Sequence, residues 1–349
     1  MTVSKLELTI GILGLVAYFF SYFAQLHRVR ILLGFIFGAW ILTRGSEVTV
    51  DGLHDTSIHV GLQEYDAGVF SSLAATIPEL VLASLMVFRG LVEVGVLSVV
   101  VASGFNIVLL GLLITLLSWK EGELEFPYER ISHEADLIRM TIIICVLIFG
   151  LGIICNGGGV PKLPREIGVF LLLSYAAYMI FMLTKKRKKG EGTSTPTVDR
   201  SLKQAASLLI VGFLGVIIGG ELITSSAEFI IHQLDLSLIT IAIILGALGS
   251  VPEHGIALIG AREGLTELGL ANLLAGISQA ILVVFGSIAL IVAVPLGDYV
   301  LFQLLAVATS LWLTKKSILD DGKLTIEEGV FILILQILLF VLLEELAYL

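Results

Sequence analysis

Two proline–glutamate pairs stand inside long apolar stretches of the sequence, Pro78-Glu79 and Pro252-Glu253. Proline has no amide hydrogen, so in a helix the carbonyl group four residues earlier loses its hydrogen-bond donor. A carboxylate beside such a carbonyl group makes an all-oxygen ligand set, which suits hard cations such as Ca²⁺. We therefore expect both prolines to interrupt helices and both glutamates to bind a cation. The expected ligands are the carboxylates of Glu79 and Glu253, the carbonyl groups of Ala74 and Leu248, and the hydroxyl groups of Thr76 and Ser250.

The two glutamates also pose an energetic problem that limits their role. A carboxylate at the centre of a bilayer costs at least about 2.5–3.5 kcal/mol. One divalent cation neutralises two carboxylates, and so do two protons. The same pair can hold Ca²⁺ in one state and protons in another, which is what an exchanger requires. The alternative is structural: the prolines bend the helices, and each glutamate hydrogen-bonds a neighbouring helix.

The composition places these pairs in a membrane protein. Of the 349 residues, 57% are hydrophobic and only 15% are charged, whereas soluble domains carry about 25% charged residues. A soluble enzyme, a nucleic-acid binder and a disordered chain are therefore excluded. Cys145 and Cys155 are too few for a disulfide framework or a cysteine-based metal site. The first apolar run is long enough to span a membrane and shows no signal-peptide cleavage site.

The apolar runs have the length of membrane-crossing helices, which need about 20 mostly apolar residues. Barrel strands are shorter and alternate in polarity. The predicted fold class is an all-α membrane protein with eleven transmembrane helices. The predicted spans are 8–27, 31–53, 66–89, 93–118, 138–156, 166–184, 204–231, 236–262, 266–293, 297–314 and 325–347.

Lysine and arginine residues predict the orientation. With eleven spans, 16 of the 21 basic residues fall on the same side as the amino terminus and 5 on the other. Cytoplasmic loops are enriched in these residues. We therefore expect a multi-pass protein with its amino terminus in the cytoplasm and its carboxyl terminus outside.

The sequence also repeats itself. A shift of 174 residues aligns 45–95 with 219–269 without gaps, matching both proline–glutamate pairs and two Gly-Leu-x-Glu-x-Gly turns. Each repeat holds five spans, an odd number, so the second enters the membrane from the opposite side. Inverted repeats with interrupted helices are typical of secondary transporters. The predicted parts are an extra amino-terminal helix (1–30), a first repeat (31–184), a basic cytoplasmic linker (185–203) and a second repeat (204–349).

The motifs TIPELVLASL (76–85) and GGELITSSAEFI (219–230), the latter followed by ALGSVPEH (247–254), resemble those of the cation/calcium exchanger superfamily. The resemblance covers spans two to eleven. It implies ten core helices in two inverted bundles, alternating access, and Ca²⁺ as the usual substrate.

The subfamily pattern is mixed. The prolines are similar to those of sodium/calcium members, whereas Glu253-His254, Asn106 and Gln279 resemble calcium/proton members. Ser103 and Ile277 stand where the sodium/calcium pattern has Asn or Asp, which removes side-chain oxygens from a sodium site. The extra first helix is also usual in calcium/proton members. Against this, Thr76 and Ser250 stand where that branch has Asn.

Other polar residues in the apolar runs each allow two roles. His254 is either a proton relay or a structural hydrogen-bond partner. Glu47, Glu221 and Glu228 either line the ion path, together with Ser103, Asn106 and Gln279, or form ion pairs, for example with Arg44.

The sequence thus favours an antiporter that exports Ca²⁺ in exchange for H⁺ across the cell membrane. We expect the organism to be a prokaryote. Ca²⁺ is the protein's transported substrate, and no cofactor and no enzyme activity are expected. The alternatives are Na⁺/Ca²⁺ exchange on the same scaffold and, less favoured, a Ca²⁺ channel.

Overall fold

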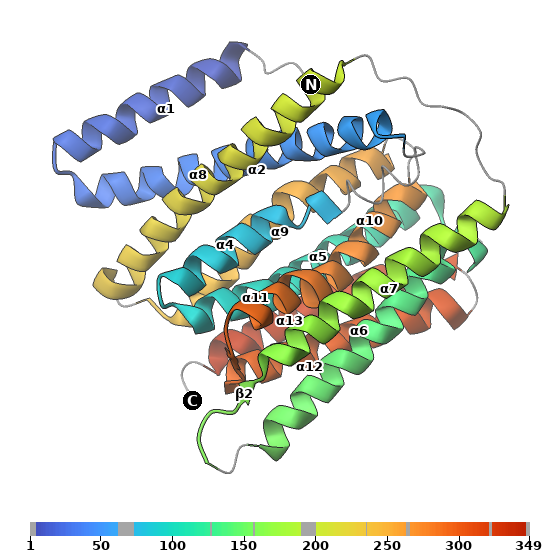
Figure 1. Ribbon diagram of the computed structural model, residues 1–349. Coiled ribbons are helices and arrows are strands. Elements are labelled where there is room, and N and C mark those ends of the chain that lie inside the picture. Colours follow the sequence, from blue (N-terminus) through green and yellow to red (C-terminus); the bar gives the residue numbers. More distant parts are fainter. Residues whose placement is uncertain are drawn as a thin grey trace.

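The computed structural model shows a bundle of long helices (Figure 1). It describes residues 5–61, 73–125, 128–155, 158–189, 200–234, 236–262, 266–320 and 323–346. The first half contains α1 (Lys5–Phe23), α2 (His27–His59), α4 (Ile77–Phe88), α5 (Val92–Glu121), α6 (Tyr128–Ile154) and α7 (Arg165–Lys189). The second half contains α8 (Leu202–Leu234), α9 (Leu238–Arg262), α10 (Thr266–Gln279), the π-helix η1 (Ala280–Phe285), α11 (Gly286–Ile291), α12 (Asp298–Asp320) and α13 (Ile326–Glu345).

These helices overlap all the predicted spans, which confirms the helical class. The start of the third span, 66–72, lies outside the described residues, and α4 covers its later part. Among the described residues, six helices are long and apolar enough to cross a membrane. The ninth span differs from a regular α-helix, because α10, η1 and α11 follow one another without a break.

The helices α2 and α8 pack against each other along their length through glycines (Figure 1). A Cβ atom added at Gly45 would lie 2.6 Å from the backbone nitrogen of Val216, and one added at Gly219 would lie 2.5 Å from that of Leu42. The two contacts are reciprocal under the shift of 174 residues. Such reciprocity is what a two-fold relation between the halves requires.

The most enclosed elements are α5 and the run from α10 to α11, which form the centre of the apolar core with α4 and α9. At the rim, α1 and α13 expose many apolar side chains, as expected of helices that face lipid. The turn between α4 and α5 is made at Gly90, whose φ of +81° favours glycine.

Two short antiparallel strand pairs lie at opposite ends of the bundle. At one end, β1 (Leu124–Glu125) pairs with β4 (Lys323–Leu324), and at the other, β2 (Lys162–Leu163) pairs with β3 (Val294–Pro295). They occupy opposite ends because α6 runs from the β1 end to the β2 end and α12 runs back from β3 to β4. Loops of the two halves are thus joined at both ends.

The two prolines have different effects on their helices. Helix α4 begins at Ile77, and Pro78 stands in its first turn, so the predicted interruption is present in the first repeat. In contrast, α9 continues through Pro252, and the predicted break there is wrong. The reason is that proline removes one hydrogen bond, to the carbonyl group of Leu248, but neighbouring bonds can carry a helix past it.

Candidate cation site

Glu79 lies in the first turn of α4. Thr76 stands just before the helix, and Pro78 precedes Glu79 within that turn. Thr76 precedes the helix and its carbonyl group accepts a hydrogen bond from the amide of Leu80 at 3.1 Å. Proline is well suited to this first turn because the amide it lacks has no partner there. The positive end of the helix dipole also favours a carboxylate at this position. The local sequence therefore builds a helix start that presents Glu79 to the protein interior.

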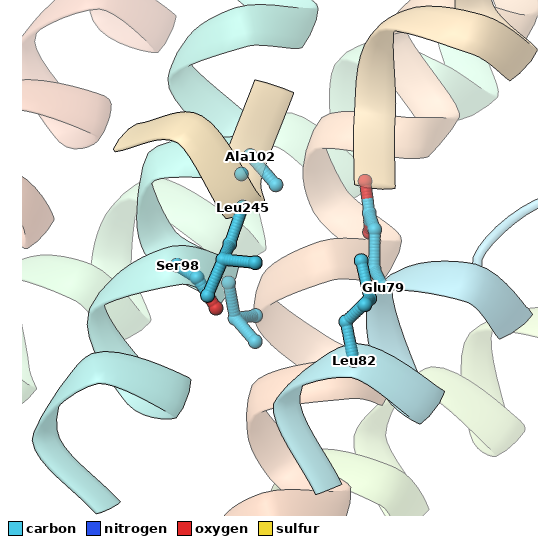
Figure 2. A pocket seen from close by; sticks show the side chains of 7 residues that line it. Glu79, Leu82, Ser98, Ala102 and Leu245 are labelled. Atoms are coloured by element: carbon cyan, nitrogen blue, oxygen red, sulfur yellow. The ribbon is translucent and has the colours of Figure 1, made fainter. Parts of the chain in front are cut away.

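The Glu79 side chain is almost completely enclosed, with 3% of its surface exposed. Neither of its carboxylate oxygens has a hydrogen-bond partner among the described residues. It borders a small cavity that is too narrow to hold a water molecule in this structure. Figure 2 shows Glu79 and Leu82 of α4 on one side of this cavity and Ser98, Ala102 and Leu245 on the other. A buried carboxylate without a partner is costly, so its position has to serve binding or protonation.

Two glycines of α9 allow this close approach. A Cβ atom at Gly249 would lie 3.1 Å from Cγ of Glu79, and one at Gly246 would lie 2.9 Å from the carbonyl oxygen of Ser98. Helix α9 therefore packs directly on the site, with Gly246 against the backbone of α5. Gly246 and Ser98 were not among the residues that the sequence singled out, and the contact of Gly249 with Glu79 was not predicted.

Ser250 and Thr76, both predicted ligands, use their hydroxyl groups in hydrogen bonds. Ser250 donates to the side-chain oxygen of Asn106, which joins α9 to α5 in the buried core. Thr76 donates to the carbonyl oxygen of Leu73 at 2.8 Å. The amide nitrogen of Asn106 is buried and has no partner among the described residues. The structure thus brings Asn106 and Ser250 together.

Ser103 lies at the contact between the two repeats. Its hydroxyl group donates to the carbonyl oxygen of Ile277 at 3.5 Å, and the two residues are separated by 174 positions. A residue that touches its own equivalent lies close to the two-fold axis. The hydroxyl group of Ser103 is therefore used to join α5 and α10.

Gln279 is placed away from the cavity. Its amide nitrogen donates to the hydroxyl oxygen of Tyr175 on α7 at 2.9 Å, and it does not line the Glu79 cavity. It is the last residue of α10 before the π-helix η1. The sequence did not reveal Tyr175, because nothing in an apolar helix distinguishes a tyrosine that accepts such a bond.

The remaining predicted carboxylates form ion pairs. Glu47 pairs with Arg44 at 2.6 Å within α2, one of the alternatives expected. Glu221 and Glu228 of α8 both pair with Arg89 at the end of α4. Beyond the spans, the hydrogen bond from Arg200 to Asp55 raises the pKa of Arg200 above its ordinary value.

In the second half of the candidate site, Glu253 and His254 are described only through their backbone. Leu248, Glu253 and His254 lie within α9, but the side chains of 252–268 lie outside the described part of the chain. Among the side chains that are described, no three of His, Cys, Asp and Glu gather in a way that could hold a metal ion. Glu79 is therefore the described half of a predicted pair.

A family model described as "Sodium/calcium exchanger protein" matches residues 30–184 and 204–343. The chain belongs to this family. The resemblance to the cation/calcium exchanger superfamily is thereby confirmed, and the protein is a multi-pass membrane protein.

Solved structures share the fold at low sequence identity. Native YfkE matches with a TM-score of 0.71 and 16% identity, over 95% of this chain and 98% of that one. The H⁺/Ca²⁺ exchanger CAX gives a TM-score of 0.71 and 13% identity, over 97% of this chain and 93% of that one. The sodium-calcium exchanger NCX_Mj, soaked with Na⁺ and Sr²⁺, gives a TM-score of 0.60 and 19% identity, over 88% of this chain and 98% of that one. No curated protein sequence matches the chain significantly.

Proposed function

We propose that this exchanger exports Ca²⁺ in return for H⁺ by alternating access, with both ions competing for Glu79 and Glu253. The observation that carries the proposal is the enclosed Glu79 carboxylate, whose oxygens have no hydrogen-bond partner among the described residues. A carboxylate in this setting is stabilised by a cation or by a proton. A neutral side chain would satisfy any purely structural need at lower cost.

The two-fold relation supports Glu253 as the second carboxylate. Glu79 packs on Gly249, whose equivalent in the first repeat is Ala75. By the same relation, Glu253 is expected to pack on Ala75, which is buried. The carboxylates would then approach the pseudo-two-fold axis from opposite sides, with the carbonyl groups of Ala74 and Leu248 beside them.

Protons rather than sodium ions are favoured as counter-ions by the neighbouring side chains. A dedicated sodium site needs additional oxygen ligands. Of the two positions concerned, Ser103 brings a single hydroxyl oxygen and Ile277 brings no side-chain oxygen. Na⁺/Ca²⁺ exchange remains the second candidate, because the matched family is described by that activity.

The test is uptake of radioactive Ca²⁺ into proteoliposomes under an imposed pH gradient or an imposed Na⁺ gradient. Proton exchange predicts uptake driven by the pH gradient alone, and Na⁺/Ca²⁺ exchange predicts the reverse. Uptake without either gradient, at channel rates, would contradict both. Glu79→Gln should abolish uptake, whereas Glu93→Gln should retain it, because Glu93 starts α5 and does not line the cavity.

The pH dependence of Ca²⁺ binding gives a second measurement. Carboxylates bind Ca²⁺ only when deprotonated, so Ca²⁺ affinity should fall as the pH is lowered. If two protons are displaced by each Ca²⁺, the affinity falls by up to about 100-fold per pH unit in the titrating range. Glu79→Gln should lower this limit to about tenfold per pH unit, because Glu253 alone then exchanges a proton. An affinity that does not change with pH would contradict proton competition.

A further inference from the structure

Arg89 joins the two halves of the chain at one end of the bundle. It follows the last turn of α4 and directs its guanidinium group at one face of α8. One terminal nitrogen donates to Glu228, and the other donates to Glu221 and, at 2.9 Å, to Ser225. These three α8 residues follow one another at spacings of four and three, so they share one helix face. We call this group the Arg89 cluster.

The Arg89 cluster connects helices with different roles. Helix α4 carries Glu79, whereas α8 packs chiefly with α2 through the glycine contacts. Between Glu79 and Arg89, α8 meets α4 at Gly220, where a Cβ atom would lie 3.0 Å from Cγ1 of Val81. This part of the α4–α8 contact is small and apolar, so it offers little resistance to sliding. The ion pairs at its end provide the directional bonds.

The positions equivalent to the three α8 residues lie in α2 at the other end of the bundle, and they carry partly different residue types. The shift of 174 residues maps Glu221, Ser225 and Glu228 onto Glu47, Asp51 and His54 of α2. Glu47 pairs with Arg44 at 2.6 Å, Asp51 with Arg200 at 3.8 Å, and His54 with Asp55 at 3.4 Å. Arg44 and Asp55 belong to α2, and Arg200 lies just before α8.

The described bonds tie α8 to α4 at the Arg89 end, and those described at the opposite end join residues of α2 with one another and with Arg200. The side chains at the end of α9, which would face α2 there, lie outside the described part of the chain. The Arg89 cluster is thus a described polar connection between α8 and the helix that carries Glu79.

We propose that the Arg89 cluster is a latch that closes the path to Glu79 from the Arg89 side, and that it breaks when α2 and α8 move to open that side. The proposal rests on the alternating access proposed above. Arg89 stands ten residues after Glu79, about 15 Å along the helix. Under the predicted orientation this is the outer side of the membrane.

The exposure of the cluster suits a bond that breaks in every cycle. The side chains of Arg89, Glu221 and Glu228 are 25%, 50% and 36% exposed. Ion pairs open to water are individually weak, since water replaces the lost partner. Two such pairs on one guanidinium group can bias a conformational equilibrium without locking it.

The experiment measures access to the cavity from each side of the membrane. In the full chain, with Cys145 and Cys155 replaced by serine, Ser98→Cys places a thiol on the cavity wall. A membrane-impermeant thiol reagent is applied to either side of sealed vesicles. A separate protein with Val160→Cys identifies the Arg89 side, because α5 and α6 lead from the Arg89 end across the bundle and back to Val160.

Adding Arg89→Gln should accelerate modification of the cavity thiol from the Arg89 side by about fivefold or more and slow it from the other side. The matched control is Arg139→Gln, which removes an ion pair to Asp136 within the single helix α6 and should change neither rate. Glu228→Gln removes one of the two carboxylates and should give a smaller shift in the same direction. Glu228→Gln also tests the latch if the Arg89→Gln protein does not fold.

Rates within twofold of the parent from both sides, in either latch variant, would overturn the latch. The measurement does not need transport, so it is independent of the proposed function. If the rates shift but the parent protein carries no Ca²⁺, the proposed function fails and the latch stands. If the parent exchanges Ca²⁺ and the rates do not shift, the latch fails and the proposed function stands.

Discussion

Glu79 is an ionisable residue in a buried, apolar environment. It is a carboxylate with 3% exposure, at a helix start, without a described hydrogen-bond partner. Its burial costs free energy that no described contact returns. Glu79→Gln should therefore leave the thermal unfolding midpoint in detergent unchanged or raise it, although it removes transport.

The comparison for this prediction is Glu328→Ala in the capping box at the start of α13. There the carboxylate accepts a hydrogen bond from the amide of Thr325 at 2.9 Å. Its loss should lower stability by about 1 kcal/mol, because a helix start loses a cap. A clear fall in the unfolding midpoint of Glu79→Gln would show that Glu79 has a stabilising partner and that its role is structural.

Gly249 should control where the Glu79 carboxylate lies. In Gly249→Ala the new methyl group would stand 3.1 Å from Cγ of Glu79, so the side chain must shift by a few tenths of an ångström. We expect Ca²⁺ affinity to fall by about tenfold, since a site held by few ligands is sensitive to small displacements. Isothermal titration or the concentration dependence of uptake measures this.

Gly286→Ala serves as the control, because its methyl group would meet Cβ of Leu171 at a similar 3.0 Å, outside the Glu79 cavity. It should affect stability without changing Ca²⁺ affinity. Equal affinity losses in both variants would mean that general packing, and not the position of Glu79, sets the binding strength.

The sequence revealed Glu79 because an acidic residue inside an apolar run is anomalous by type alone. It did not reveal Gly249 or Arg89. Glycine is common in this chain, and an arginine near the end of a span looks like an ordinary topology signal. Both roles depend on distances between helices that are more than 100 residues apart in sequence. Such relations follow from packing, which a single sequence does not display.

At the scale of elements, hydrophobic runs identified the helices but not their internal geometry. The π-helix η1 follows Gln279 within a run of apolar residues, AILVVF, that shows no period to distinguish π from α. The proline–glutamate motif likewise begins a helix in the first repeat and is accommodated inside α9 in the second. The same local signal therefore has two outcomes, because the surrounding helices decide whether the chain turns.

The glycine contacts between α2 and α8 predict that these helices depend on close backbone approach. In Gly219→Ala the methyl group would lie 2.5 Å from the backbone nitrogen of Leu42 and 2.7 Å from the carbonyl oxygen of Gly38. Backbone cannot move aside as a side chain can, so the helices must separate. We expect a loss of about 1–3 kcal/mol in stability and a fall in transport.

Gly150→Ala in α6 is the matched substitution, because nothing lies within 4 Å of its new methyl group. Alanine has the higher helix propensity by about 1 kcal/mol, so this variant should be neutral or slightly more stable. Unfolding by heat or denaturant in detergent compares the two. If Gly219→Ala is as stable as Gly150→Ala, then α2 and α8 are not held at the distance described.

At the scale of the whole molecule, the reciprocal contacts and the opposed strand pairs fit a chain whose two halves are related by a two-fold axis in the membrane plane. The repeat of 174 residues predicted this relation from the sequence, and the pairs Gly45–Val216 and Gly219–Leu42 show it at one interface. The symmetry brings Ser103 to its own equivalent, Ile277. What symmetry cannot predict is where the halves differ in residue type: Ser225 and Glu228 of the Arg89 cluster correspond to Asp51 and His54.

The orientation in the membrane is the last property that the charges predict. Eleven crossings place the two termini on opposite sides, and 16 of the 21 lysine and arginine residues then share the side of the amino terminus. Because basic loops are retained in the cytoplasm, a reporter that is active only in the cytoplasm should work at the amino terminus and fail at the carboxyl terminus. Replacing the five consecutive basic residues 185–189 should weaken this preference, since they form the largest basic group on that side. Activity at both termini would require an even number of crossings and would contradict the eleven predicted spans.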